Sequence, residues 1–170
     1  MANVLFLVGS LREGAFSAEL AKSAEKALEG KATVSYLDWK DVPVFSQDLE
    51  AEAPAAVKAA RAAVLAADAI WIFSPVYNAG IPGSVRNLLD WLSRALDLSD
   101  TSCVSKKKKK VVTVSISSFA HQDEAAVEYR KLLPFIRTSL VDEFTLATIG
   151  APVDEAQLAK QADALLAAIN

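Results

Sequence analysis

The 170-residue sequence has one cysteine, one histidine and six glycines, and its formal net charge is only −3. A single cysteine, Cys103, excludes a disulfide within the chain and makes a reducing cytoplasm the expected location. The small net charge gives no general attraction to nucleic acid or to an anionic membrane, so neither is expected as a partner. Hydrophobic residues make up 52% and charged residues 23%, which is typical of a folded globular chain.

Long hydrophobic runs are also missing. The N-terminal "MANVLFLVGS" has no basic region before its short apolar run and reaches Gly9 at once, so it predicts a buried first strand and not a signal peptide. The longest later apolar stretch, "AVLAADAIWIF", is interrupted by Asp68 and is too short to cross a bilayer. We therefore expect a soluble chain that does not insert into a membrane.

Segments typical of strands and helices alternate along the whole chain, which favours one parallel sheet with helices on both faces. The length fits a single domain spanning residues 1–170, because no linker or shift in composition divides it. In such sheets, ligands bind beyond the carboxyl ends of the strands, where the strand order reverses. The predicted strands are residues 4–9, 32–37, 69–74, 111–117 and 139–146, and the predicted helices include residues 17–30, 54–67, 82–96 and 153–169.

The loop after the first predicted strand, "GSLREGAFS", does not fit the two commonest nucleotide-binding patterns. Ala15 and Phe16 stand where a nucleotide-hydrolysing loop requires lysine and a hydroxyl residue. Leu11 stands where a dinucleotide-binding loop requires its second glycine. Nucleotide hydrolysis and this form of dinucleotide binding are therefore not expected.

The same loop nevertheless has the features of an anion site. It carries hydroxyls at Ser10 and Ser17, a cation at Arg12, and the start of a helix near Ser17. Backbone N–H groups and the positive dipole end of a helix favour a phosphate there, and an arginine adds a charge-assisted contact. The alternative is that Ser17 is only the helix cap and that Arg12 is a solvated loop residue.

A second loop follows the third predicted strand and reaches the same edge of the sheet. In "SPVYNAGIPGSVRNLLDWLSRA", Pro75, Tyr77, Asn78, Gly80 and Pro82 form a rigid, turn-rich bridge into a helix. Backbone N–H groups near 77–80 could face a flat, polar heterocycle, with the tyrosine as an amphipathic wall. They could equally form only a tight turn, with the second proline starting the helix.

Taken together, "GSLREGAFSAELA", "LDWKDVPVFSQDLE" and "PVYNAGIPGSVRNLLDWLSR" resemble the NADPH-dependent FMN reductase family, which includes quinone, azo-dye and chromate reductases. The resemblance spans roughly residues 4–95. It implies a flavodoxin-like fold, that is, an α/β domain with a three-layer, doubly wound, five-stranded parallel sheet. It also implies FMN as cofactor, NADPH or NADH as hydride donor, a small acceptor (a quinone, flavin, azo compound or metal oxyanion), and a homodimer or homotetramer.

The resemblance further implies which residues bind the cofactor. The phosphate would be held by one part of the first loop, and the isoalloxazine ring would lie between the second loop and the loop after the fourth strand. This last loop, "SSFAHQDE", lacks the glycines that the family usually has there, which puts the shape of the donor and acceptor site in question. The residues implied are Ser10, Leu11, Arg12, Ala15, Phe16 and Ser17 for the phosphate, and Pro75, Val76, Tyr77, Asn78, Gly80, Ser117, Ser118 and Phe119 for the ring.

In such a protein the flavin carries the chemistry, so we predict no catalytic side chain and no metal site. Two other functions stay open. A flavodoxin-type electron carrier would bind FMN but dock to protein partners, although such carriers are usually more acidic than −3. A non-catalytic flavin-binding regulator is the third possibility, suggested by the unusual "SSFAHQDE" loop.

Three features outside the two loops each have two interpretations. His121 could protonate a quinone, but a loop histidine before a helix capped by Asp123 is favoured. Lys106–Lys110 could attract the extra phosphate of NADPH or an anionic acceptor, but a solvated lead-in to a strand is commoner. Trp91 lies off the apolar stripe of its helix, so we expect it at a subunit contact; otherwise it packs under a neighbouring loop.

Overall fold

The computed structural model describes residues 1–95 and 109–169, so Cys103 and residues 106–108 of the lysine run lie outside the described residues. Its strands form one parallel sheet in the order β2-β1-β3-β4-β5, and β6 also pairs with β4. The strands are β1 (Ala2–Val8), β2 (Ala32–Tyr36), β3 (Ala69–Pro75), β4 (Val111–Ser118), β5 (Ser139–Leu140) and β6 (Thr145–Thr148).

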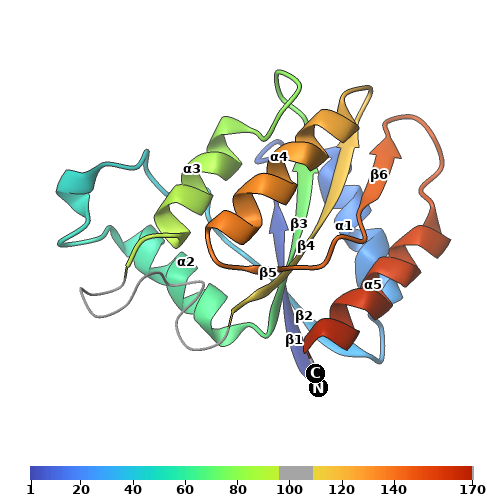
Figure 1. Ribbon diagram of the computed structural model, residues 1–170, viewed down its shortest axis with the longest axis horizontal. Helices are drawn as coiled ribbons and strands as arrows, with labels where there is room; N and C mark the ends of the chain where they lie inside the picture. Colours follow the sequence, from blue (N-terminus) through green and yellow to red (C-terminus); the bar gives the residue numbers. More distant parts are fainter. Residues whose placement is uncertain (96–108, 170) are drawn as a thin grey trace.

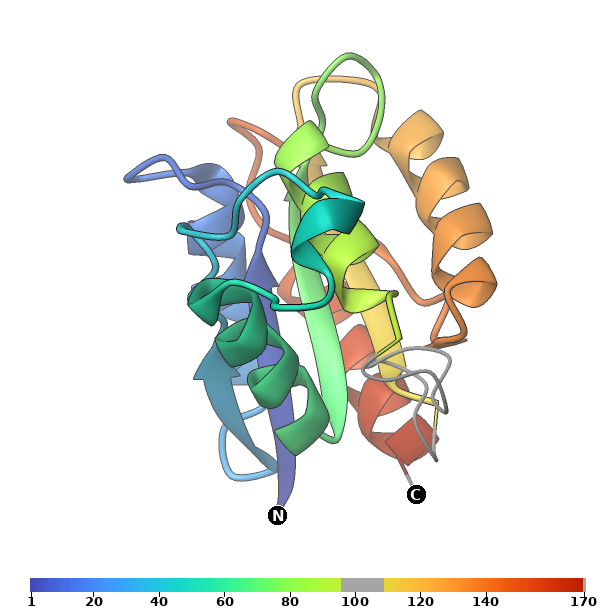
Figure 2. The ribbon, with the colours of Figure 1, turned by 90° about the vertical axis from the view of Figure 1, so that its left-hand side faces the viewer.

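Helices cover both faces of the sheet, as the sequence predicts (Figures 1 and 2). The two apolar layers follow from this division: one lies under α1 and α5, and the other lies under α2, α3 and α4. The helices are α1 (Phe16–Ala27), α2 (Ala55–Ala66), α3 (Gly83–Leu92), α4 (Gln122–Phe135) and α5 (Glu155–Ile169), with a short 3₁₀ turn, η1 (Gln47–Leu49), before α2.

The central strands are buried on both faces, which explains their continuous apolar sequence. All but the last residue of β3 is buried, and the aromatic side chains of Phe6, Trp71 and Phe73 pack against one another on the α1–α5 side. The indole N–H of Trp71 donates to Ser115 Oγ at 2.9 Å, so its polar atom is satisfied inside the core. Strand β2, at the edge, is less buried, as its alternating sequence predicts.

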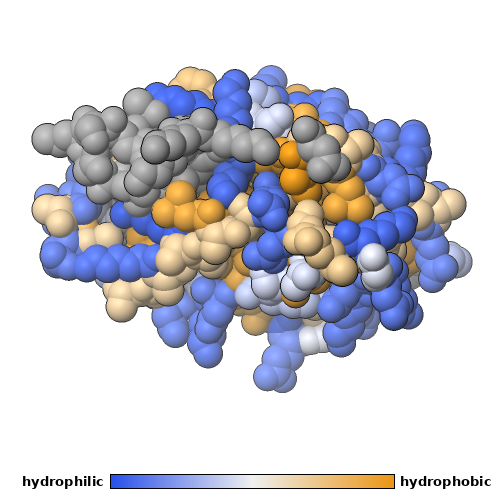
Figure 3. Space-filling view, turned by 90° about the horizontal axis from the view of Figure 1, so that it is seen from below, coloured by the Kyte–Doolittle hydropathy of each residue, from blue (hydrophilic) through white to orange (hydrophobic). Residues whose placement is uncertain are grey.

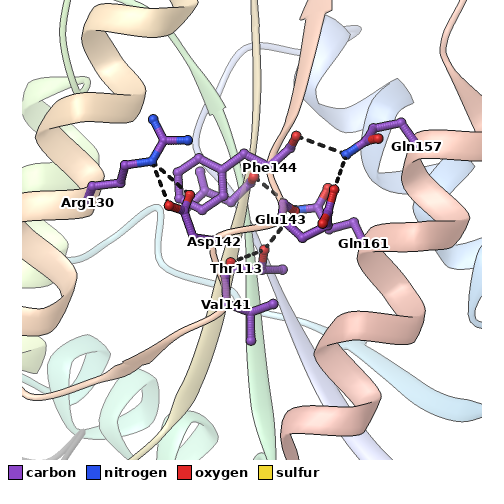
Figure 4. A network of polar contacts seen from close by, with 9 residues as sticks. Thr113, Arg130, Val141, Asp142, Glu143, Phe144, Gln157 and Gln161 are labelled. Carbon is purple, nitrogen blue, oxygen red and sulfur yellow. Dashed lines mark hydrogen bonds and ion pairs between the residues drawn. The ribbon is translucent and has the colours of Figure 1, made fainter.

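The predicted fifth strand, residues 139–146, is divided in two, so the sheet has six strands rather than five. The chain leaves the ladder after Val141, whose N–H still donates to the Val112 carbonyl at 2.8 Å, and side chains of other elements hold it there. Thr113 Oγ1 donates to the Val141 carbonyl at 3.0 Å, and Arg130 forms an ion pair with Asp142 at 2.8 Å (Figure 4). These partners lie far away in the sequence, and a local apolar pattern carries no sign of them.

Gln161 of α5, labelled with Thr113 of β4 in Figure 4, joins β4 to β6 beyond this break. Its fully buried amide donates to Thr113 Oγ1 at 2.8 Å and to the Val114 carbonyl at 2.9 Å. Its Oε1 accepts from Ser115 Oγ at 3.0 Å and from the Thr145 N–H and hydroxyl at 3.1 and 2.6 Å. The hydrogen-bonding capacity of the buried amide is thus fully used, which favours a single arrangement of this sheet edge.

Trp91 is fully buried within the chain, so the prediction that it lies at a subunit contact is wrong. Its ring packs edge-on against Phe45, with ring centroids 4.8 Å apart, and its N–H donates to the Pro43 carbonyl at 2.9 Å. Asn87 donates to the same carbonyl and accepts from the Phe45 N–H at 2.8 Å. The alternative interpretation is correct: Trp91 packs under the neighbouring loop of residues 37–50.

Both termini lie at the end of the sheet where the strands begin. Figure 3 shows this end of the molecule from below, with hydrophilic side chains around smaller hydrophobic areas. Lys110 leads into β4 at this end, and its ammonium donates to the Leu65 carbonyl at 3.0 Å and to the Ala67 carbonyl. This lysine therefore ties β4 to the end of α2 and lies away from the end where the strands finish.

Candidate functional site

A pocket of about 230 Å³ opens at the carboxyl end of the sheet, between the loops that follow β1, β3 and β4. Strand β2 lies on one side of β1 and strand β3 lies on the other, so the strand order reverses between β1 and β3. Open α/β sheets bind ligands at such a reversal. The lining residues are Ser10, Arg12, Ala15, Phe16, Ser17, Pro75, Val76, Tyr77, Ser117, Ser118, Phe119 and Ile149.

The first wall contains a buried hydroxyl group without a partner. Helix α1 begins at Phe16, and its N-cap is Ala15, which makes no side-chain capping hydrogen bond; Ser17 is therefore not the cap. Ser17 is only 2% exposed, and its Oγ makes no hydrogen bond within residues 1–95 and 109–169. A buried polar atom without a partner is uncommon and costly, so a ligand is the natural partner for it.

The surroundings of this hydroxyl suit an anion. The first N–H groups of a helix have no partner inside the helix and lie at the positive end of its dipole. The guanidinium of Arg12 also lines the pocket and donates to the neighbouring Glu13 carbonyl at 3.1 Å, while Ser10 Oγ accepts from the Arg12 N–H at 3.4 Å. This wall therefore has the donor set of a phosphate site.

The second wall carries a tight turn. Tyr77 and Gly80 exchange backbone hydrogen bonds of 3.2 and 3.1 Å, and the two residues between them, Asn78 and Ala79, have φ angles of 52° and 59°. Two of the N–H groups that the sequence suggested for a heterocycle are thus used inside the turn. Asn78 and Gly80 do not line the pocket, and neither does Leu11 of the first loop.

The third wall follows β4 and supplies an exposed aromatic ring. Phe119 is 77% exposed and Tyr77, on the second wall, is 49% exposed, although both line the pocket. Ile149 completes this wall, because its N–H donates to the Ser118 carbonyl at 3.0 Å just after β6 ends. Sequence reasoning missed Ile149; the only signal was that a predicted strand ended nearby at the same edge of the sheet.

His121 lies next to the third wall but does not line the pocket. It is the N-cap of α4 with a φ of 64°, so the prediction of Asp123 as the cap is wrong. Its Nδ1 lies 2.8 Å from Glu124 Oε1, and this hydrogen bond lowers the pKa of the Glu124 carboxyl. The favoured interpretation of His121 as a residue at the start of a helix agrees with this position. Among residues 1–95 and 109–169, no three metal-ligating side chains come together.

The fold agrees with the comparison to known families. The model of the NADPH-dependent FMN reductase family matches residues 2–151. The chain belongs to this family. FMN reductases combine FMN with NAD(P)H as the electron donor, so the predicted fold class, cofactor and enzyme class are confirmed.

Individual relatives resemble this FMN reductase in sequence, and a solved structure resembles it in fold. A quinone reductase of Escherichia coli K12 is 32% identical over 158 residues, covering 89% of this chain and 80% of the relative. A probable NADPH:quinone oxidoreductase of rice is 38% identical over 96 residues, which cover 54% of this chain and 47% of the relative. The solved structure of FerB, an NAD(P)H:acceptor oxidoreductase of Paracoccus denitrificans, superposes with a TM-score of 0.81 at 22% identity. The match covers 99% of this chain and 97% of FerB.

Proposed function

We propose that this FMN reductase takes electrons from NADPH or NADH into FMN held in the pocket between the β1, β3 and β4 loops, and delivers them to a quinone. The observation that carries the proposal is the buried Ser17 hydroxyl at the start of α1, which has no hydrogen-bond partner among the described residues. Its position beside Arg12 and an uncapped helix start matches what a phosphate needs. The family membership then names the phosphate as that of FMN.

Each wall has its own part in this proposal. Bound FMN supplies hydride acceptance and electron release. Ser10, Arg12 and Ser17, with backbone groups of residues 11, 15 and 16, hold the phosphate. The isoalloxazine ring lies against residues 75–77 on one side and residues 117–119 on the other. Asn78 and Gly80 act on the ring through the turn that they form and not as lining residues.

A quinone is favoured over the other acceptors for two reasons. The relatives named above are quinone reductases, and the rim of the pocket carries two exposed aromatic rings, Tyr77 and Phe119. A flat, apolar acceptor gains stacking contacts with such rings, whereas a small metal oxyanion does not. Free flavins and azo compounds are flat as well, and they are the next candidates.

An anaerobic titration of the FMN-loaded chain with NADPH tests the proposal. Stoichiometric loss of the visible flavin absorbance, reversed by adding a quinone, is the expected result. Bound FMN that stays oxidised in excess NADPH and NADH would refute the reductase function and favour the non-catalytic flavin-binding regulator. Reduced FMN that reoxidises only with a protein acceptor would identify the electron carrier.

Assembly and location complete the proposal: one domain over residues 1–170, in a cytoplasmic homodimer or homotetramer. The outer side of α4 supports self-association, since Phe135 is 84% exposed and Val127, two helical turns earlier, is also exposed. The single cysteine supports a reducing compartment. No helix of the described ranges, 1–95 and 109–169, combines the length and apolar character needed to span a bilayer. Light scattering of the purified chain measures the assembly.

A further inference from the structure

We propose that Glu128 of α4 is a positioning residue for the pocket, and that Gly80 is a glycine because the Glu128 carboxylate rests on it. The carboxylate would thereby fix the 77–81 turn, whose first residue, Tyr77, lines the second wall. The consequence for FMN rests on the proposed function, whereas the consequence for the turn does not.

The contacts between the turn and Glu128 are direct. The N–H of Ile81, at the end of the turn, donates to Glu128 Oε2 at 3.0 Å. Gly80 is buried, and a Cβ atom built on it would lie 2.8 Å from Glu128 Oε1 and 3.0 Å from Oε2. Real Cβ atoms do not approach so closely, so a side chain at position 80 would require the carboxylate, which is the far end of a flexible side chain, to shift away from its place beside the Ile81 N–H.

The turn needs an external anchor. Ala79 has a φ of 59°, a conformation that disfavours residues with a Cβ atom, and Asn78 beside it has a φ of 52°. Within the turn, only the pair of hydrogen bonds between Tyr77 and Gly80 opposes this strain. A charge-assisted hydrogen bond from the next residue to α4 is well placed to hold the conformation.

The other end of the same loop is held by the residue next to Glu128. The hydroxyl of Tyr129 donates to Ser74 Oγ at 2.8 Å, and Ser74 Oγ donates to the Pro75 carbonyl at 2.7 Å. Tyr129 is fully buried, and burial raises the pKa of its phenol well above the usual range, so the phenol stays protonated and can donate. Two consecutive residues of α4 thus fix the two ends of the 75–81 loop.

Helix α4 also begins directly after the third wall of the pocket, so one helix sets the positions of the second and third walls (Figure 1). The side chains of Arg86 and Lys131 line the same surface hollow as Glu128. Glu128 does not line the pocket, and its hydrogen bond goes to Ile81 of the turn. It is therefore a positioning residue and not a catalytic one.

Four variants of the full chain test the proposal: Glu128→Ala, Gly80→Ala, their double variant, and Glu128→Gln, which keeps a hydrogen-bond acceptor. Gly83→Ala is the matched control, because a Cβ there meets no atom within 4 Å. The first readout is amide hydrogen exchange of Ile81 in the cofactor-free chain. Loss of its acceptor should speed exchange about tenfold in the first three variants, and leave Glu128→Gln and Gly83→Ala close to the unmodified chain. Unchanged exchange in Glu128→Ala would overturn the proposal.

The second readout is the dissociation constant for FMN, with the visible circular dichroism of the bound flavin as a signature of ring position. Glu128→Ala and Gly80→Ala should each weaken binding about five- to tenfold, and the double variant should be no weaker than either. Losses that multiply would show that Gly80 contacts the cofactor independently and would overturn the proposal. If the unmodified chain binds no FMN, the proposed function fails, while the exchange of Ile81 still decides the role of Glu128.

Discussion

Replacing Ser17 by alanine should stabilise the cofactor-free chain. The Ser17 hydroxyl is buried and makes no hydrogen bond within the described residues, so folding removes it from water without compensation. A buried donor or acceptor left unsatisfied costs about 1–3 kcal/mol, and alanine favours a helix over serine by a few tenths of a kcal/mol, about 0.5 at most. We expect a gain of about 1–2 kcal/mol, or roughly 3–6 °C in the thermal midpoint of a domain of this size.

The same substitution should weaken FMN binding. A hydrogen bond to a charged group such as a phosphate contributes about 1.5–3 kcal/mol, which corresponds to roughly a 10- to 100-fold change in dissociation constant. Bound FMN would therefore stabilise the Ser17→Ala variant less than the unmodified chain at equal concentration. The two effects have opposite signs, and a general disturbance of the fold cannot produce both.

Thermal unfolding with and without FMN, together with a flavin fluorescence titration, measures both effects. Ser23→Ala is the matched control, because Ser23 lies in the same helix but does not line the pocket. It should leave FMN binding unchanged and shift the midpoint by no more than the difference in helix propensity. A less stable cofactor-free Ser17→Ala variant, or one that binds FMN normally, would refute the assignment of the hydroxyl to the phosphate.

Four further predictions concern the rest of the structure. Gln161→Leu should lower the free energy of unfolding in urea by about 3 kcal/mol or more, since it leaves several buried polar groups of β4 and β6 without a partner. Trp91→Phe should cost about 1 kcal/mol in the same assay through the lost indole hydrogen bond, and leave the mass in light scattering unchanged. Phe119→Ala should change unfolding by no more than about 0.5 kcal/mol, since the ring is largely exposed, and raise KM for a quinone severalfold. The thermal midpoint should fall as the pH drops below about 4.5, because the hydrogen bond with Arg94 lowers the pKa of Glu50 in the folded chain.

The outcomes that contradict these predictions are specific. A Gln161→Leu variant as stable as the unmodified chain would mean that water replaces the amide at the sheet edge. A change of assembly in Trp91→Phe would restore the subunit contact expected from the sequence. An unchanged KM in Phe119→Ala would place the acceptor elsewhere. For Glu50, stabilisation is present above the carboxyl pKa of the unfolded chain and is lost as the pH falls through the lower folded value. Glu50→Gln should reduce the slope of that part of the profile without removing it, because hydrogen bonds lower the pKa values of Glu52, Glu124 and Glu143 as well.

The central sheet could be predicted from the sequence because its strands are buried on both faces and read as unbroken apolar runs. Residues 139–146 were also predicted as one strand, although Asp142 and Glu143 interrupt their apolar residues. They divide where Thr113 and Arg130 hold the chain between β5 and β6. The prediction that Trp91 lies at a subunit contact was wrong for a similar reason. Helical periodicity shows which side of a helix is apolar, but it does not show that a loop such as residues 37–50 covers another side.

The site was predictable to the extent that each loop follows a strand to the same edge of the sheet. Most of the residues implied for FMN line one pocket, since the strand order reverses between β1 and β3. The sequence could not show which way the tight turn faces. Gly80 was expected near the ring, but its open side is filled by Glu128, which lies on a helix 48 positions later.

Several departures from local folding rules lie at the pocket end of the sheet, and others lie elsewhere, since Arg61 Nε is buried without a partner among the described residues and Arg137 has a φ of 70°. Helix α1 starts without a side-chain cap, the Ser17 hydroxyl is buried without a partner, and Ala79 and His121 have positive φ angles beside the second and third walls. At mid-sheet, by contrast, the buried amide of Gln161 has all its hydrogen bonds. Each departure is unfavourable by itself, so those at the pocket end call for a compensating interaction. The departures are explained if the binding of a phosphate and a flat ring stabilises this end, as the Ser17 and Glu128 variants will test.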